Sequence, residues 1–194
     1  MSIFFQSSYK KLGLAMAALL FLCCFAATAW GANTQIVSVS PATQNVVTGA
    51  SFDVTIVYDH DDPATTTGIG FAVYYDSSQL TYSSYSNFLN EGGIQITPTE
   101  GADTNDDDGN ANTDRKVTMA WNDSTISWPS SFPSNLVILN FNARNDATAG
   151  NTPINLYVNS PGANDNGSQS TQVNNGTVTI LEAPKVTNAT APDG

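Results

Sequence analysis

The feature that most constrains the fold is an alternation of apolar and polar residues with a period of two, which recurs in five segments between Ser51 and Val158. Apolar residues at every second position place one face of a β-strand in a core and the other face in solvent. The predicted core positions are Phe52, Val54, Ile56, Tyr58, Ile69, Phe71, Val73, Tyr75, Val117, Met119, Trp121, Val137, Leu139, Phe141, Ala143, Ile154, Leu156 and Val158.

Helical patterns are nearly absent after residue 32. No window there keeps the three-four apolar spacing of an amphipathic helix, and Gly, Pro, Asn, Asp, Ser and Thr interrupt every long segment. About nine strands are predicted on this pattern. Short antiparallel strands of this kind pack as two sheets with the alternating apolar residues between them. The predicted class is therefore all-β, a two-sheet antiparallel sandwich with jelly-roll-like topology.

The N-terminal segment 1–32 has the pattern of a secretory signal peptide. Two lysines precede an apolar run over 12–27, which ends in small residues. Both cysteines, Cys23 and Cys24, lie in this segment, so the exported protein would form no disulfide and no thiolate metal site. We therefore predict a protein secreted to the extracellular space, with the periplasm as the other destination.

The remainder is predicted to form one domain with a short tail. No apolar segment after residue 32 is long enough to span a bilayer. The strand pattern covers 33–181, an ordinary length for one domain. After Leu181 the sequence loses its periodicity and becomes rich in Pro, Ala and Thr, so 182–194 is predicted to be a flexible tail or linker.

The exported part is strongly acidic. It carries four basic residues against 17 acidic ones, a net charge of −13. This charge disfavours binding to nucleic acid or anionic lipid, and it favours solubility and cation binding. A solvated acidic surface without any ligand is the simpler interpretation.

Three stretches carry a resemblance to a known family. They are VSVSPATQNVVTGASFDVTIVY from Val37, GIGFAVYYDSSQLTY from Gly68 and NLVILNFNA from Asn135. Their order resembles the bacterial cohesin domain, the receptor module that docks dockerin modules in extracellular enzyme assemblies. The resemblance implies a nine-stranded sandwich and a non-catalytic scaffolding module, with a dockerin-type protein module as its partner.

The resemblance also implies that contacts come from one exposed sheet, made mainly of the family's strands three, five, six and eight. If the alternating positions above face the core, the residues between them face outward. The predicted partner-binding residues are Tyr74, Gln95, Thr97, Thr118, Asn155 and Tyr157. The alternative for the two tyrosines is an ordinary strand position, because aromatic residues favour strands regardless of binding.

The insert 101–116 is the best candidate for specific chemistry, because it gathers carboxylates and amides around Gly109. Calcium takes six to eight oxygen ligands, and alternate side chains of a tight loop can turn inward together. The predicted ligands of a structural calcium ion are Asp103, Asn105, Asp107, Asn112 and Asp114. The loop lacks the spacing and the bidentate glutamate of an EF-hand, and a solvated hairpin loop is an equal alternative.

The segment WNDSTISWP raises a second functional class. Exposed tryptophan rings can stack on sugars, but Trp121 continues the apolar face of Val117 and Met119 and is predicted to be core. Trp128 is the ring expected to be exposed, with packing beneath Pro129 as the alternative.

Enzymatic function is not predicted. His60 is the single histidine and is expected to be a solvated loop residue, so neither a Ser-His-Asp triad nor a zinc site with two histidines is supported. The three glutamates, Glu91, Glu100 and Glu182, lack a recognisable catalytic setting. The leading hypothesis is a secreted cohesin-like binding module. The alternatives are a carbohydrate-binding module of polysaccharide metabolism, bound to extracellular polysaccharide, and a surface adhesin building block.

Overall fold

The computed structural model describes residues 34–60, 65–91, 93–164 and 167–184. The signal peptide expected over 1–32 and most of the expected tail lie outside the described residues. The described part contains strands, turns and loops and no helix, as expected for the all-β class. Accordingly, no helix in this part is long and apolar enough to cross a membrane.

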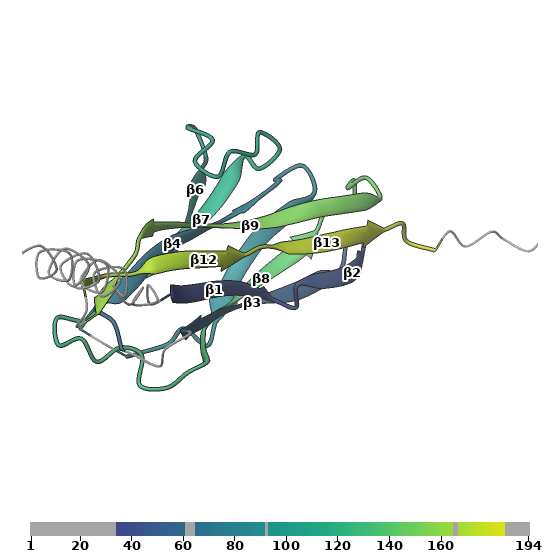
Figure 1. The fold of residues 1–194 in the computed structure, drawn as a ribbon. Helices are drawn as coiled ribbons and strands as arrows, with labels where there is room; N and C mark the ends of the chain where they lie inside the picture. Colours follow the sequence, from purple (N-terminus) through teal and green to yellow (C-terminus); the bar gives the residue numbers. More distant parts are fainter. Residues whose placement is uncertain (1–33, 61–64, 92, 165–166, 185–194) are drawn as a thin grey trace, which may run out of the picture. The chain divides into compact units, whose positions relative to one another are not determined.

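Eleven strands build two facing sheets (Figure 1). A separate short ribbon is formed by β10 (Ala163–Asn164) and β11 (Gly167–Ser168). The strands of the two sheets are β1 (Thr34–Ser40), β2 (Thr43–Val47), β3 (Ser51–His60), β4 (Gly68–Tyr75), β5 (Leu80–Ser86), β6 (Ile94–Ala102), β7 (Arg115–Asn122), β8 (Ser134–Ala143), β9 (Gly150–Ser160), β12 (Ser170–Asn174) and β13 (Gly176–Leu181). The first sheet has the order β12-β1-β3-β8-β5, and the second has the order β2-β13-β9-β4-β7-β6. All these strands lie between Thr34 and Leu181, within the segment 33–181 that the pattern assigned to the domain.

The number of strands in the two sheets exceeds the expected nine because the first and last strands each divide between the two sheets. The chain leaves β1 at Pro41 and continues as β2 in the other sheet, and it leaves β12 at Asn175 and continues as β13. β1 pairs with β12 in parallel, and β2 pairs with β13 in parallel, whereas the other strand pairs are antiparallel. The two ends of the domain are thereby joined along both sheets.

The core lies between the sheets, where the alternation placed it. Every predicted core position is buried except Val158, which is partly buried against the same layer. Phe141 of β8 packs its ring against Tyr75 at 5.2 Å and against Phe52 at 5.8 Å, so it joins residues of both sheets. Aromatic rings in such arrangements bury large apolar areas and dominate the energy of a core.

Two side chains expected in solvent are instead buried. His60 ends β3 beneath Phe132, with its Nε2 3.1 Å from Oε1 of Gln169. Trp128 lies between Tyr58 and Trp121, with ring centroids at 5.2 and 5.8 Å. The prediction of an exposed Trp128 was wrong because the loop after β7 folds back onto the end of the sandwich, where Thr66 N–H donates to the Trp128 carbonyl at 2.7 Å. Contacts between distant loops leave no local sequence period.

The point where the last strand changes sheets predicts a sharp sensitivity to side-chain size. A Cβ at Gly176 would overlap the side chain of Val39, whereas a Cβ at Gly101 of β6 would meet no atom within 4 Å. We expect Gly176→Ala to lower the free energy of unfolding by about 1–3 kcal/mol, as overpacking does. Gly101→Ala is the matched control and should leave it unchanged or slightly raised. Urea denaturation measures both, and equal stability of the two variants would contradict the described crossover.

Candidate functional site

The candidate site is the outer face of four neighbouring strands, β9, β4, β7 and β6, in the second sheet (Figure 1). The register pairs Ala72 of β4 with Thr118 of β7 on one side and with Tyr157 of β9 on the other. These three residues therefore share the face opposite the core. The predicted positions Thr118 and Tyr157 lie on this outer face, and Tyr157 is 44% exposed.

The part of this face near β6 is apolar and concave. Ile94 and Ile96 are 70% and 56% exposed, the largest fractions among the exposed large hydrophobic residues of the described chain. They border a hollow of about 320 Å³, which is at the small end for a binding pocket. Its lining includes Gly70 and Ala120, which contribute only backbone and a methyl group.

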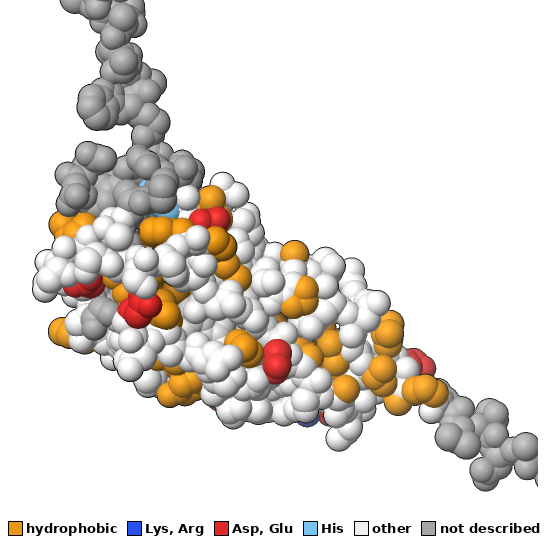
Figure 2. Space-filling model, turned by 90° about the horizontal axis from the view of Figure 1, so that it is seen from below, with side chains coloured by type: hydrophobic (Ala, Val, Ile, Leu, Met, Phe, Trp, Pro, Cys, Tyr) orange, Lys and Arg blue, Asp and Glu red, His pale blue; other side chains and the backbone are white. Residues whose placement is uncertain are grey.

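The first sheet presents a different surface. Seen from the side of β1 and β3, hydrophobic side chains are interspersed with polar side chains and backbone (Figure 2). Scattered apolar groups are normal on a soluble protein, whereas an apolar hollow edged by exposed isoleucines marks a binding surface. The second sheet is therefore the better candidate for a partner site.

The structure corrects the predicted outward positions on β6. Gln95 pairs with Trp121, whose ring is in the core, so Gln95 lies on the core side, and its Nε2 donates to the Glu91 carbonyl at 2.8 Å. Ile94 and Ile96 take the outer face in its place. Thr97 is exposed, but it lies at a register irregularity between Ile96 and Thr99. An edge strand with apolar residues facing solvent has the same period as a normal strand, so alternation assigned the wrong face.

The other end of the same face is covered by the acidic insert. Tyr74 is 2% exposed: the ring of Tyr157 meets it edge-on at 6.5 Å, and Lys116 Nζ lies 5.6 Å from its ring centre. Burial raises the pKa of Tyr74 to about 12. Asn155, next to Tyr74 in the register, donates to Asp108 Oδ2 at 2.8 Å. The prediction that Tyr74 lies open to a partner was therefore wrong, and Asn155 is already engaged by the insert.

The insert folds as a closed loop between β6 and β7. Its base is fixed by a hydrogen bond from Asp103 N–H to the Asp114 carbonyl at 2.9 Å. Asp114 accepts from the amide and hydroxyl of Ser77 at 2.7 and 2.6 Å, so its carboxylate is directed away from the loop interior. Asp107 pairs with Lys116 at 2.5 Å, and this hydrogen bond raises the pKa of Lys116 above its usual value.

The structure does not gather the predicted calcium ligands. Asn105 and Asn112 are exposed, and Asp107 and Asp114 have the partners just described. The carboxylates that come together are those of Asp103, Asp106 and Asp108, with one oxygen from each within 4.8 Å of the others. Asp103 is thus the one predicted ligand in the observed cluster. The sequence contained both missed aspartates, but a simple alternation along the loop selected their neighbours.

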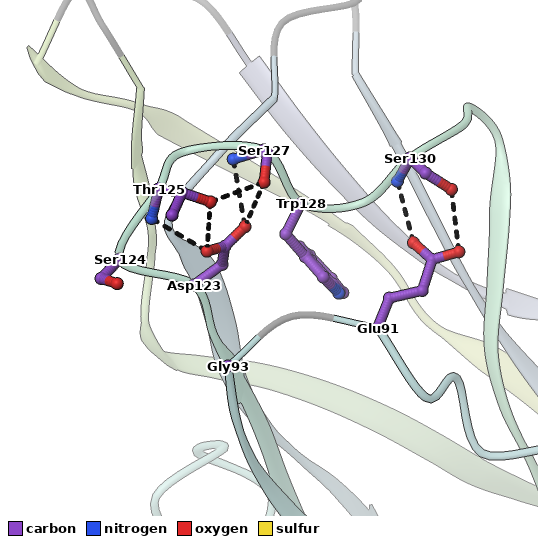
Figure 3. Close-up of a pocket in the computed structure, with 8 residues that line it drawn as sticks. All are labelled: Glu91, Gly93, Asp123, Ser124, Thr125, Ser127, Trp128 and Ser130. Atoms are coloured by element: carbon purple, nitrogen blue, oxygen red, sulfur yellow. Dashed lines mark hydrogen bonds between the residues drawn. The ribbon is translucent and has the colours of Figure 1, made fainter.

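A second hollow, of about 630 Å³, lies beside Trp128. Figure 3 shows the indole of Trp128 between the carboxylates of Asp123 and Glu91. Asp123 accepts from the hydroxyls and amides of Thr125 and Ser127 at 2.7–3.1 Å. Glu91 accepts from the amide and hydroxyl of Ser130 at 2.9 and 2.8 Å. Both carboxylates therefore serve to shape their own loops.

In this hollow, Trp128 does not suit sugar stacking and Asp123 does not suit general acid catalysis. The hydroxyls of Ser127 and Thr125, together with the Thr125 amide, hold the pKa of Asp123 far below its usual range. A general acid needs the opposite shift. Trp128 is almost fully buried, so its ring faces cannot serve as a platform for a sugar.

The lowered pKa of Asp123 predicts a pH-dependent contribution to stability. A carboxyl whose pKa is lower in the folded state stabilises the fold above its unfolded pKa, and the contribution is lost as pH falls toward the folded pKa. We expect Asp123→Asn to lower the melting temperature at pH 5–7, because an amide nitrogen would face donors of Ser127 or Thr125. The difference from wild type should shrink between about pH 4 and pH 2. A difference that stays constant from pH 7 to pH 2 would contradict this role.

No protein-family model matches the chain, and no curated protein sequence does either. Solved structures match its fold. The sixth cohesin of scaffoldin B from Acetivibrio cellulolyticus, solved with a Cel5 dockerin, is 20% identical with a TM-score of 0.56, over 76% of this chain and 99% of that one. The seventh ScaB type I cohesin of Pseudobacteroides cellulosolvens is 16% identical with a TM-score of 0.53, over 81% and 98%.

A third similar structure is the OlpC cohesin of Clostridium thermocellum, solved as a type I complex with the dockerin Doc435. It is 13% identical with a TM-score of 0.54, over 81% of this chain and 99% of that one. At these identities the similarity concerns the arrangement of the chain. The sequence-based expectation about the fold is thereby confirmed: the described domain has the β-sandwich fold of the cohesins.

Proposed function

We propose that this chain is an exported, non-catalytic binding module that docks a dockerin-type protein module on the outer face of β4, β6, β7 and β9. The observation that carries the proposal is the pair Ile94 and Ile96, exposed beside an apolar hollow on that face. Support comes also from the fold, because similar structures include cohesins in complex with dockerins. Export rests on the signal-peptide pattern of residues 1–32.

The energetic argument concerns the two isoleucines. Full burial of one isoleucine side chain is worth roughly 1.5–3 kcal/mol, so a partner that covers both regains several kcal/mol that the free protein forgoes. Apolar anchors with polar groups around them are typical of binding hot spots. Thr118 and Asn122 are polar neighbours of the patch on β7.

The charge of the chain adds a constraint on the partner. The exported part has a net charge of −13, and the insert at one end of the face holds Asp103, Asp106, Asp107 and Asp108. Complementary charge across an interface speeds association and excludes wrong partners. We therefore propose a partner surface with an apolar centre and basic residues on the side that approaches the insert.

Polysaccharide binding is the alternative with less support. Trp121 and Trp128 are both buried, so among the described residues the exposed rings belong to tyrosines such as Tyr85 and Tyr157. A role as an adhesin or surface building block would use the same sandwich without a dockerin. Both alternatives remain distinct outcomes of the experiment below.

The proposal predicts that a charge within the apolar patch weakens docking. We would immobilise residues 33–194, pass the producer's secreted proteins and polysaccharides over them, and identify what is retained. A dockerin-bearing protein recovered in this way should bind the Ile96→Asp variant at least tenfold more weakly, because loss of a hot spot costs about 2 kcal/mol or more. Surface plasmon resonance with the purified dockerin measures the change.

Leu181→Asp is the matched control. Leu181 is an exposed aliphatic residue of the same sheet, and β9, β4 and β7 separate its strand from β6. The Leu181→Asp substitution introduces the same charge as Ile96→Asp, and it should leave the affinity for the dockerin within about twofold of wild type. Equal weakening by both variants would contradict the proposed face, and retention of polysaccharide alone would overturn the dockerin proposal.

A further inference from the structure

The acidic insert brings three carboxylates close enough together to share one calcium ion. Oxygen atoms of Asp103, Asp106 and Asp108 all lie within 4.8 Å of one another. Calcium binds oxygen at 2.3–2.6 Å, so ligands on opposite sides of one ion are about 5 Å apart. Magnesium binds at 2.0–2.1 Å and demands a tighter octahedron. Separations below about 5 Å are compatible with one calcium ion, and calcium tolerates irregular ligand geometry better than magnesium does.

The burial of Asp103 is an independent indication of a ligand. Its side chain has no exposed surface, and its Oδ2 has no hydrogen-bond partner among the described residues. Its Oδ1 has only long contacts, at 3.4 Å to Lys116 Nζ and to the Asp107 amide. A buried carboxylate without strong partners is unfavourable, and a bound cation such as calcium removes much of that cost.

The nearby positive charge does not meet this need. Lys116 Nζ lies 2.5 Å from Asp107 Oδ2 but 3.4 Å from Asp103 Oδ1. Its stronger ion pair is therefore with Asp107. Asp108 accepts from Asn155 and from the Thr113 hydroxyl, both at 2.8 Å, and these donors are neutral. Lys116 is thus shared between Asp103 and Asp107, so one ammonium group faces more carboxylates than it can pair with.

We propose that Asp103, Asp106 and Asp108 bind one calcium ion, with backbone carbonyls or water as further ligands. The ion would hold the insert against the sheet, because Asp108 is hydrogen-bonded to Asn155 of β9 and Asp103 adjoins the end of β6. It would thereby fix the cover over Tyr74 at one end of the outer face. The site itself does not depend on what that face binds.

The test is calorimetric titration of residues 33–194 with calcium chloride, and separately with magnesium chloride, in 0.15 M potassium chloride. We expect one calcium ion per chain and much weaker binding of magnesium. Asp106→Asn should lower calcium affinity at least tenfold, because affinity follows the number of charged ligands. Asp106 is exposed and has a φ of 53°, a conformation that asparagine also adopts, so this variant keeps the fold.

Two further variants test the assignment. Asp146→Asn removes an exposed aspartate that pairs with Arg144 in another loop, and it should bind calcium like wild type. Lys116→Gln removes the cation nearest the cluster, and it should raise calcium affinity. In chelator, the melting temperature of Asp106→Asn should match or exceed that of wild type, because one repulsive charge is gone. Added calcium should raise the melting temperature of this variant less than that of wild type. Absence of calcium binding, or equal losses in Asp106→Asn and Asp146→Asn, would overturn the proposal.

Discussion

The apolar layer between the two sheets is the interaction on which the rest of the structure depends. The strands contain no cysteine, and the described residues form no helix that could cover a sheet. The packed side chains between the sheets must therefore stabilise the strands. Phe141 joins the two sheets at one place. At another place, Trp121 stacks on Trp128 and on Phe88, with the Phe88 ring centroid at 4.6 Å. Because such layers are close-packed, they fix which side of each strand remains available outside. The division of the first and last strands then joins both sheets along their length.

That rigid layer allows one outer face to carry two different environments. Near β6 the face is open, with Ile94 and Ile96 beside small residues of β4 and β7. Near the insert the same strands are covered, because Asp107 and Asp108 reach Lys116 and Asn155. A protein partner would therefore meet an apolar centre with an acidic margin. A loop that is held by a cation would define that margin, while the sheet would define the centre.

The period of two predicted most of the fold, because it follows directly from the geometry of a strand. It placed Val54, Met119 and Leu139 in the core correctly. It could not assign Ile94 and Ile96, since an edge strand with an apolar outer face has the same period as one with an apolar inner face. It also left Tyr74 apparently open, because the loop that covers it begins some thirty residues later and leaves no trace in the local pattern.

The acidic insert illustrates the same limit for the site. Composition indicated an oxygen-rich loop, and Asp103, one of its candidate ligands, lies in the observed cluster of carboxylates. Which aspartates converge depends on the positive φ of Asp106 and on the pairing of Asp107 with Lys116, and these are properties of the folded loop. Exposure of Ile94 and Ile96 is likewise visible only after folding, and it is the central support for a docking face.

The most direct measurement of that central claim is an NMR titration of the labelled domain with the dockerin-bearing protein that it retains. The account predicts that amide and methyl signals of β6, β7 and β9 shift, including those of Ile94 and Ile96, while signals of β3 and β8 in the first sheet stay in place. Shifts confined to the first sheet would contradict it.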